Sequence, residues 1–189
     1  MKAQPIPRGV GTLIVYIGFG CRVLLAVVFF AAAVSKVRGR RDRTEFRASL
    51  AAFGVKARWR SAVAAAVITC ELATAALLPA DVTALAGLAA GAAMLIVFTM
   101  AIGSALRRGG SASCRCFGAS AQPLSRRHLV RNAILLAITA VGVTGTLPIA
   151  ASGGAGWDPA ALTLSAFVAV VLAALVISYD DLVAVVLPH

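Results

Sequence analysis

Charged side chains are scarce in this chain. They make up 13% of its 189 residues, whereas 60% are hydrophobic. A soluble globular domain carries roughly 25% charged and 45–50% apolar residues. This balance excludes an ordinary soluble domain and predicts an all-α, polytopic membrane protein. Because the chain is too short for both a membrane part and a sizeable soluble domain, we expect residues 1–189 to form one integral membrane domain.

Cysteine and histidine are also few, with four cysteines and two histidines. Four cysteines are too few for a disulfide scaffold. Two of them, Cys21 and Cys70, lie in apolar runs, where a cysteine usually acts as a small buried hydrophobic residue. Neither His128 nor His189 has a metal-ligand spacing with the other two cysteines. We therefore expect no metal site.

The net charge of +11 is concentrated in two places. Nine of the eighteen Lys and Arg residues lie between Lys36 and Arg60, and six lie between Arg107 and Arg131. Basic clusters between apolar runs are typical of topology signals and of contacts to anionic lipid headgroups. A nucleic-acid-binding protein would instead gather its basic residues on one exposed face. The lipid bilayer is the expected partner, and nucleic acid is not.

Five apolar runs are long enough to cross a bilayer. The first would form about 36 Å of helix, which exceeds the roughly 30 Å hydrocarbon core. It is too long, and too closely followed by basic residues, for a cleaved signal peptide. We predict a bundle of about five spans at residues 11–34, 61–78, 82–106, 129–147 and 160–178.

A basic stretch follows the first span and contains Phe46, Leu50 and Phe53 at helical spacing. Arginines at intervening positions can cover the opposite face. This pattern predicts a short amphipathic helix in the membrane interface. Gly54 is expected to end it.

Charge also predicts how the chain is oriented. The first and third connectors between spans, together with Arg131 just inside the fourth span, carry fifteen Lys and Arg residues, and the second and fourth connectors carry none. The positive-inside rule then places both basic connectors in the cytoplasm. With five spans, the N-terminus is expected outside and the C-terminus inside.

Four polar residues fall within the spans or close to their ends. Arg22 and Glu71 lie near the middle of the first two spans, where a charge costs at least about 2.5–3.5 kcal/mol and needs a partner. We expect the two to pair, either as a structural clamp or as the centre of a polar pocket for a quinone or a proton path. Lys36 should reach the lipid headgroups. Asn132 should make a hydrogen bond to another helix.

Cys114 and Cys116 lie one residue apart in the connector of residues 107–127. Arg115 lies between them, and nearby cations favour the thiolate, which is the reactive form. Neighbouring glycines permit the tight backbone that a bridge between the two would need. So small a ring is strained, and strained disulfides tend to be labile, catalytic or regulatory. The residues alone leave open a redox-active pair or a lipid-modified pair.

The order of these features resembles the methylamine utilisation protein MauE family, which is related to DoxX-like membrane proteins. The similarity covers roughly residues 10–147. The Cys-x-Cys-Phe-Gly stretch is its most specific part, although Arg115 stands where family members often have glycine. The matching residues are an arginine in the first span, then Val28-Phe29-Phe30, Ser35-Lys36, Phe46, Phe53-Gly54, Glu71-Leu72, Phe98-Thr99, Cys114-Arg115-Cys116-Phe117-Gly118 and Arg131-Asn132.

The resemblance implies thiol–disulfide chemistry at the bacterial inner membrane. Proteins of this family are implicated in maturing the disulfide-rich small subunit of methylamine dehydrogenase, alongside a thioredoxin-like partner. For this chain, the resemblance implies that Cys114 and Cys116 alternate between dithiol and disulfide while acting on a disulfide-containing client. A client that folds outside the cytoplasm would suit an outward-facing connector. The charge pattern predicts the opposite side, and we follow the charge pattern.

Two other functional classes fit the same sequence. One is a non-catalytic membrane assembly subunit whose cysteines are incidental. The other is a DoxX-like protein that binds a quinone or another small molecule around Arg22 and Glu71.

Overall fold

The computed structural model describes residues 8–107, 126–152 and 158–186. Within these ranges the chain is helical and contains no strand. A single 3-10 turn, η1 (Ala57–Trp59), precedes the third helix. The α-helices are α1 (Arg8–Val37), α2 (Arg40–Ser49), α3 (Arg60–Leu77), α4 (Ala84–Arg107), α5 (Arg126–Ser152) and α6 (Pro159–Val186).

Five helices in the described ranges are long and apolar enough to cross a membrane. Their hydrophobic segments confirm the predicted all-α polytopic architecture, and their bounds agree with the predicted spans to within a few residues. These segments are Gly11–Val37, Ala57–Leu77, Ala84–Arg107, Arg127–Ile149 and Pro159–Ser178.

Two helices continue past their predicted ends. We expected the fourth span to end at Pro148, but α5 runs through it to Ser152. A proline inside a helix removes one backbone hydrogen bond and can bend the helix without ending it. Likewise α6 passes Asp180 and Asp181 and ends at Val186, because aspartate has only a modest helix penalty.

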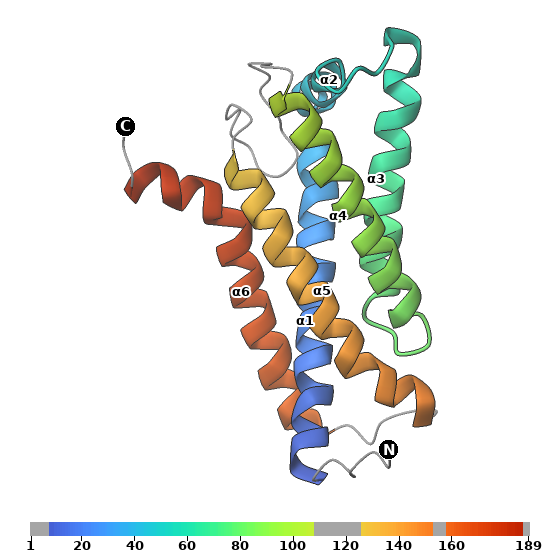
Figure 1. Cartoon of the computed structure of the whole chain (residues 1–189), viewed down its shortest axis with the longest axis vertical. Coiled ribbons are helices and arrows are strands. Elements are labelled where there is room, and N and C mark those ends of the chain that lie inside the picture. The colour runs from blue at the N-terminus through green and yellow to red at the C-terminus, as the bar shows by residue number, and fades with distance from the viewer. Residues whose placement is uncertain (1–7, 108–125, 153–157, 187–189) are drawn as a thin grey trace.

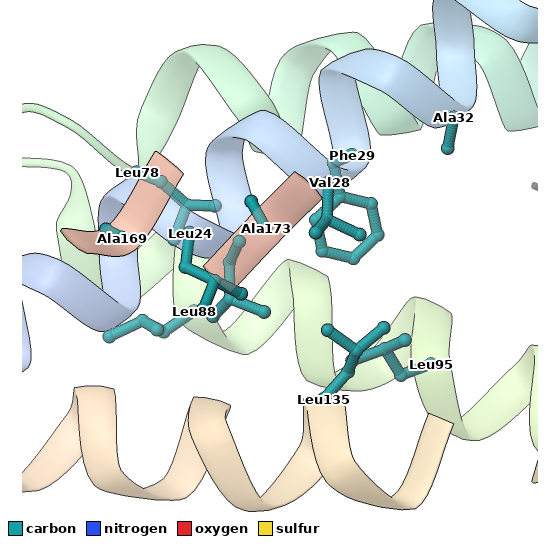
Figure 2. Close-up of a cluster of buried hydrophobic side chains, with 11 residues drawn as sticks. Leu24, Val28, Phe29, Ala32, Leu78, Leu88, Leu95, Leu135, Ala169 and Ala173 are labelled. Carbon is teal, nitrogen blue, oxygen red and sulfur yellow. The ribbon is translucent and has the colours of Figure 1, made fainter. Parts of the chain in front are cut away.

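Helix α1 occupies the centre of the bundle and packs against α3, α5 and α6 (Figure 1). Helices α3 and α4 form an antiparallel hairpin on one side, and α6 lies on the other side with little contact to α5. The buried apolar core lies where α1 meets these helices. Its side chains include Leu24, Val28, Phe29, Leu88, Leu95, Leu135, Ala169 and Ala173 (Figure 2).

Helices α1 and α5 cross at a pair of glycines. A Cβ on Gly145 would lie 2.5 Å from the Gly18 Cα and 2.6 Å from the Ile14 carbonyl oxygen. No side chain fits at such a distance, so the two backbones touch directly. Small residues allow this close approach between transmembrane helices, which gain packing energy from it.

Helix α2 has the predicted amphipathic character. Phe46 and Leu50 are buried against Ala64 of α3, while the arginines of α2 are exposed. The helix ends at Ser49, earlier than predicted. Gly54 instead ends the following turn with a φ of 82°, a left-handed conformation that suits glycine. In Figure 1, α2 lies across the end of the bundle at which α4 ends and α5 begins.

Candidate functional site

Arg22 is fully buried in the middle of α1, but it does not pair with Glu71. Its guanidinium donates from Nε to the Leu78 carbonyl (2.8 Å) and from Nη2 to the Pro79 carbonyl (2.6 Å). Its Nη1 forms an ion pair with the Asp81 carboxylate at 2.7 Å. The predicted Arg22–Glu71 ion pair is therefore wrong.

The actual partners of Arg22 follow from the offset between α1 and α3. Helix α3 has 18 residues against 30 in α1, and its C-terminal end lies beside the middle of α1. Carbonyls at a helix C-terminus lack intrahelical donors, and the helix dipole is negative there. Arg22 supplies both hydrogen bonds and the opposite charge, and so fastens the α3–α4 turn to the central helix.

Glu71 pairs with Lys36 instead, at 2.7 Å between Nζ and Oε1. The side chains are 2% and 0% exposed. The Lys36 ammonium also donates to the Ala32 carbonyl at 3.1 Å, and the Phe46 ring lies 5.4 Å from it. The expectation that Lys36 reaches the headgroups is therefore wrong. Because Glu71 offers a buried counter-charge and Phe46 of α2 covers the site, Lys36 turns inward.

The first turns of α5 add further buried polar side chains. Asn132 donates to the Thr99 hydroxyl of α4 at 3.3 Å, which confirms the predicted hydrogen bond to another helix. His128 and Arg131 are buried on the same helix. Arg131 follows His128 by three residues and Asn132 follows it by four, the two spacings at which helical side chains are neighbours. Arg131 is close enough to Lys36 for their charges to interact.

The buried polar side chains at this end of the bundle are what we call the polar cluster: Lys36, Glu71, His128, Arg131 and Asn132. It holds one carboxyl group and two basic side chains besides His128, so basic groups outnumber acidic ones and its net charge is positive. The second carboxylate oxygen, Glu71 Oε2, accepts no hydrogen bond from the described residues. In the charge pattern of the sequence Arg131 counts only as a topology signal. Its spacing of three residues from His128 was the sign that it lies on the same face of α5.

The predicted redox residues, Cys114, Arg115 and Cys116, lie outside the described residues. The helices on either side of their connector are described, with α4 ending at Arg107 and α5 beginning at Arg126.

Those two helices pack together close to the connector. Ile102 and Ala105 of α4 contact Leu129 of α5 and Phe53, which follows α2. Both basic connectors therefore belong to the same end of the bundle (Figure 1). The connector enters α5 within one or two turns of His128, Arg131 and Asn132.

Of the two other cysteines, Cys21 is half-buried and Cys70 is exposed, and both are free thiols. The expectation that both are buried is therefore wrong for Cys70. It lies on the outer face of α3, where an apolar run meets lipid instead of the core. No three His, Cys, Asp or Glu side chains of the described ranges gather as a metal site.

These features define a class: a polytopic α-helical membrane protein with a buried, net-positive cluster beside a cysteine-containing connector. Residues 14–145 of the chain match the model of a protein family described as "Methylamine utilisation protein MauE". That region is more than half of the chain and runs from α1 into α5. The chain therefore belongs to the MauE family, which confirms the resemblance seen in its sequence. No curated protein and no solved structure matches it.

Proposed function

We propose that this MauE-family protein takes part in the thiol–disulfide maturation of a partner protein, as in the biogenesis of the methylamine dehydrogenase small subunit. Cys114 and Cys116 are the reacting pair. The observation that carries this proposal is where their connector joins the bundle. It leaves α4 and enters α5 at the end that holds the net-positive polar cluster. A cationic environment favours the thiolate form of cysteine, which is the nucleophile.

The exchange proceeds in two steps with a client disulfide. One thiolate of the pair attacks a client sulfur, which forms a mixed disulfide and releases a client thiolate. The second cysteine then attacks the mixed disulfide and releases the other client thiolate. The client gains two electrons, and Cys114 and Cys116 become a disulfide. A thioredoxin-like dithiol returns two electrons and restores the pair, and the reverse sequence oxidises a client.

The proposed location is the bacterial inner membrane, with the cysteine connector in the cytoplasm. Support comes from the charge distribution, because both basic connectors lie at one end of the bundle and basic connectors are retained inside. The thioredoxin-like donor is then a cytoplasmic protein.

Replacing both cysteines tests the function directly. A Cys114→Ser/Cys116→Ser variant is expected to abolish maturation of the client, because serine cannot form the mixed disulfide. The measurement is the disulfide content of the client, resolved on non-reducing gels after thiol alkylation. The matched control is Cys21→Ser/Cys70→Ser, which removes the same number of thiols and should retain wild-type maturation. A double variant of the connector that still matures the client would favour the assembly-subunit alternative.

The small-molecule alternative loses its geometric basis. A pocket centred on both Arg22 and Glu71 would need the two side chains to converge. Arg22 is instead engaged at the α3–α4 turn by Leu78, Pro79 and Asp81, and Glu71 is engaged by Lys36.

A further inference from the structure

A cavity of about 290 Å³ lies between α1, α2 and α3, next to the polar cluster. The proposed thiol chemistry makes no use of it. The lining residues that matter here are Arg43, Arg47, Ser61, Ala65, Ile68 and Thr69.

One end of this cavity is basic. Arg43 and Arg47 are four residues apart on α2, a spacing that places them on the same helix face. Both are exposed. A hydrogen bond from Arg43 Nη2 to the Val37 carbonyl at 3.3 Å holds that guanidinium near the end of α1. The described salt bridges involve Arg22, Lys36 and Arg41, so no described carboxylate neutralises Arg43 or Arg47.

The rest of the cavity runs along α3, a transmembrane helix, and also contacts Lys36 near the end of α1. Ser61 lies in the first turn of α3, and Thr69 lies eight residues further on, which corresponds to about 12 Å of helix rise. Between them, Ala65 and Ile68 contribute small and apolar side chains. The cavity is therefore cationic beside α2, and its α3 wall begins with the Ser61 hydroxyl and continues with the small and apolar side chains of Ala65 and Ile68, while Thr69 and Lys36 add polar groups further along. A phospholipid presents its phosphate, its glycerol and its acyl chains in the same order.

We propose that this cavity binds one anionic phospholipid. The phosphate lies between the guanidinium groups of Arg43 and Arg47, and the Ser61 hydroxyl is a further donor. The first segments of the acyl chains lie against Ala65 and Ile68 and continue into the bilayer.

A net-negative lipid is favoured over a zwitterionic one because no carboxylate of the described residues forms a salt bridge with either arginine. A zwitterionic headgroup would bring a second cation beside them. Basic pockets between transmembrane helices are suited to such headgroups. A lipid bound here would join α2 to α1 and α3, and would hold Phe46 in place over Lys36.

The test measures lipid binding to the protein purified in a neutral detergent, by native mass spectrometry and by the lipid-induced rise in unfolding temperature. Phosphatidylglycerol is the probe. An Arg43→Gln/Arg47→Gln variant should bind it about 25-fold more weakly, from roughly fivefold per arginine. The matched control is Arg40→Gln/Arg41→Gln, which removes the same charge from the same helix but not from the cavity wall. This control should bind close to wild type.

Two further arms identify what is bound. Phosphatidylcholine, inorganic phosphate and glycerol 3-phosphate should each give little stabilisation, because a zwitterionic lipid lacks the net charge and the others lack acyl chains. An Ala65→Leu variant should weaken binding without any change in charge, because the larger side chain fills the cavity beside Ile68. Equal loss in the two arginine double variants would overturn the site in favour of a diffuse basic surface. Equal stabilisation by soluble phosphate would overturn the lipid as its ligand.

Discussion

The free energy of unfolding of an Arg22→Met variant should be lower than that of the wild type by about 3 kcal/mol or more. Methionine retains much of the side-chain volume but leaves the Leu78 and Pro79 carbonyls without the donors that Arg22 supplies. A hydrogen bond from a charged group contributes roughly 1.5–3 kcal/mol, and a buried acceptor left unsatisfied bears a desolvation penalty. The measurement is reversible unfolding of the purified protein in mixed micelles.

Asp81→Asn is the matched control for this variant. It removes the ion pair but leaves both hydrogen bonds of Arg22 to the backbone. The Asp81 side chain is 32% exposed, so its charge is partly screened and its loss should cost about 1 kcal/mol or less. If Asp81→Asn lowered the free energy of unfolding as much as Arg22→Met, the ion pair would be the main contact that fastens the turn. The hydrogen bonds from Arg22 to the carbonyls at the end of α3 would then be secondary.

The Lys36–Glu71 pair predicts a strong coupling in a double-mutant cycle. Glu71→Leu should destabilise the bundle by about 3–5 kcal/mol, because it leaves the Lys36 ammonium buried without its counter-charge. Lys36→Met should cost less, because removing Lys36 also relieves its repulsion with Arg131. The double variant should recover most of the lost stability, since replacing both members of a buried pair by apolar residues is often neutral.

The same cycle separates a structural role from a functional one. Each variant is assayed for unfolding free energy and for client maturation. If the charges only hold α1 against α3, the double variant recovers both stability and maturation. If the polar cluster assists the thiol chemistry, the double variant recovers stability but not client maturation. Additive destabilisation in the double variant would contradict the pairing itself.

The sequence predicted the spans because long apolar runs with few charges have one stable form in a bilayer, the helix. It predicted α2 for a similar reason, since Phe46 and Leu50 recur at helical spacing. These are local features. The end of α5 was harder to predict, because a proline such as Pro148 can either end or bend a helix.

The partners of the buried charges could not be predicted in the same way. The expected Arg22–Glu71 pair assumed that residues half-way along two spans lie at the same depth. The real offset between α1 and α3 depends on packing, including the contact of α1 with α5 at Gly18 and Gly145. A lysine at the end of a span usually extends its ammonium group to the lipid headgroups. Lys36 turns inward instead, because a buried carboxylate on another helix pairs with it. No pattern in the sequence near Lys36 reveals that partner.

The measurement that tests the central claim most directly is labelling of Cys114 and Cys116 with a membrane-impermeant maleimide. A Cys21→Ser/Cys70→Ser background restricts the reaction to the connector. We expect no labelling in intact spheroplasts. In inverted membrane vesicles we expect labelling that rises after reduction, because the proposed redox cycle keeps the two cysteines of some molecules joined as a disulfide. Labelling from outside the cell would contradict the cytoplasmic location. Complete labelling without reduction, unchanged when the disulfide-containing client is present, would contradict the redox cycle.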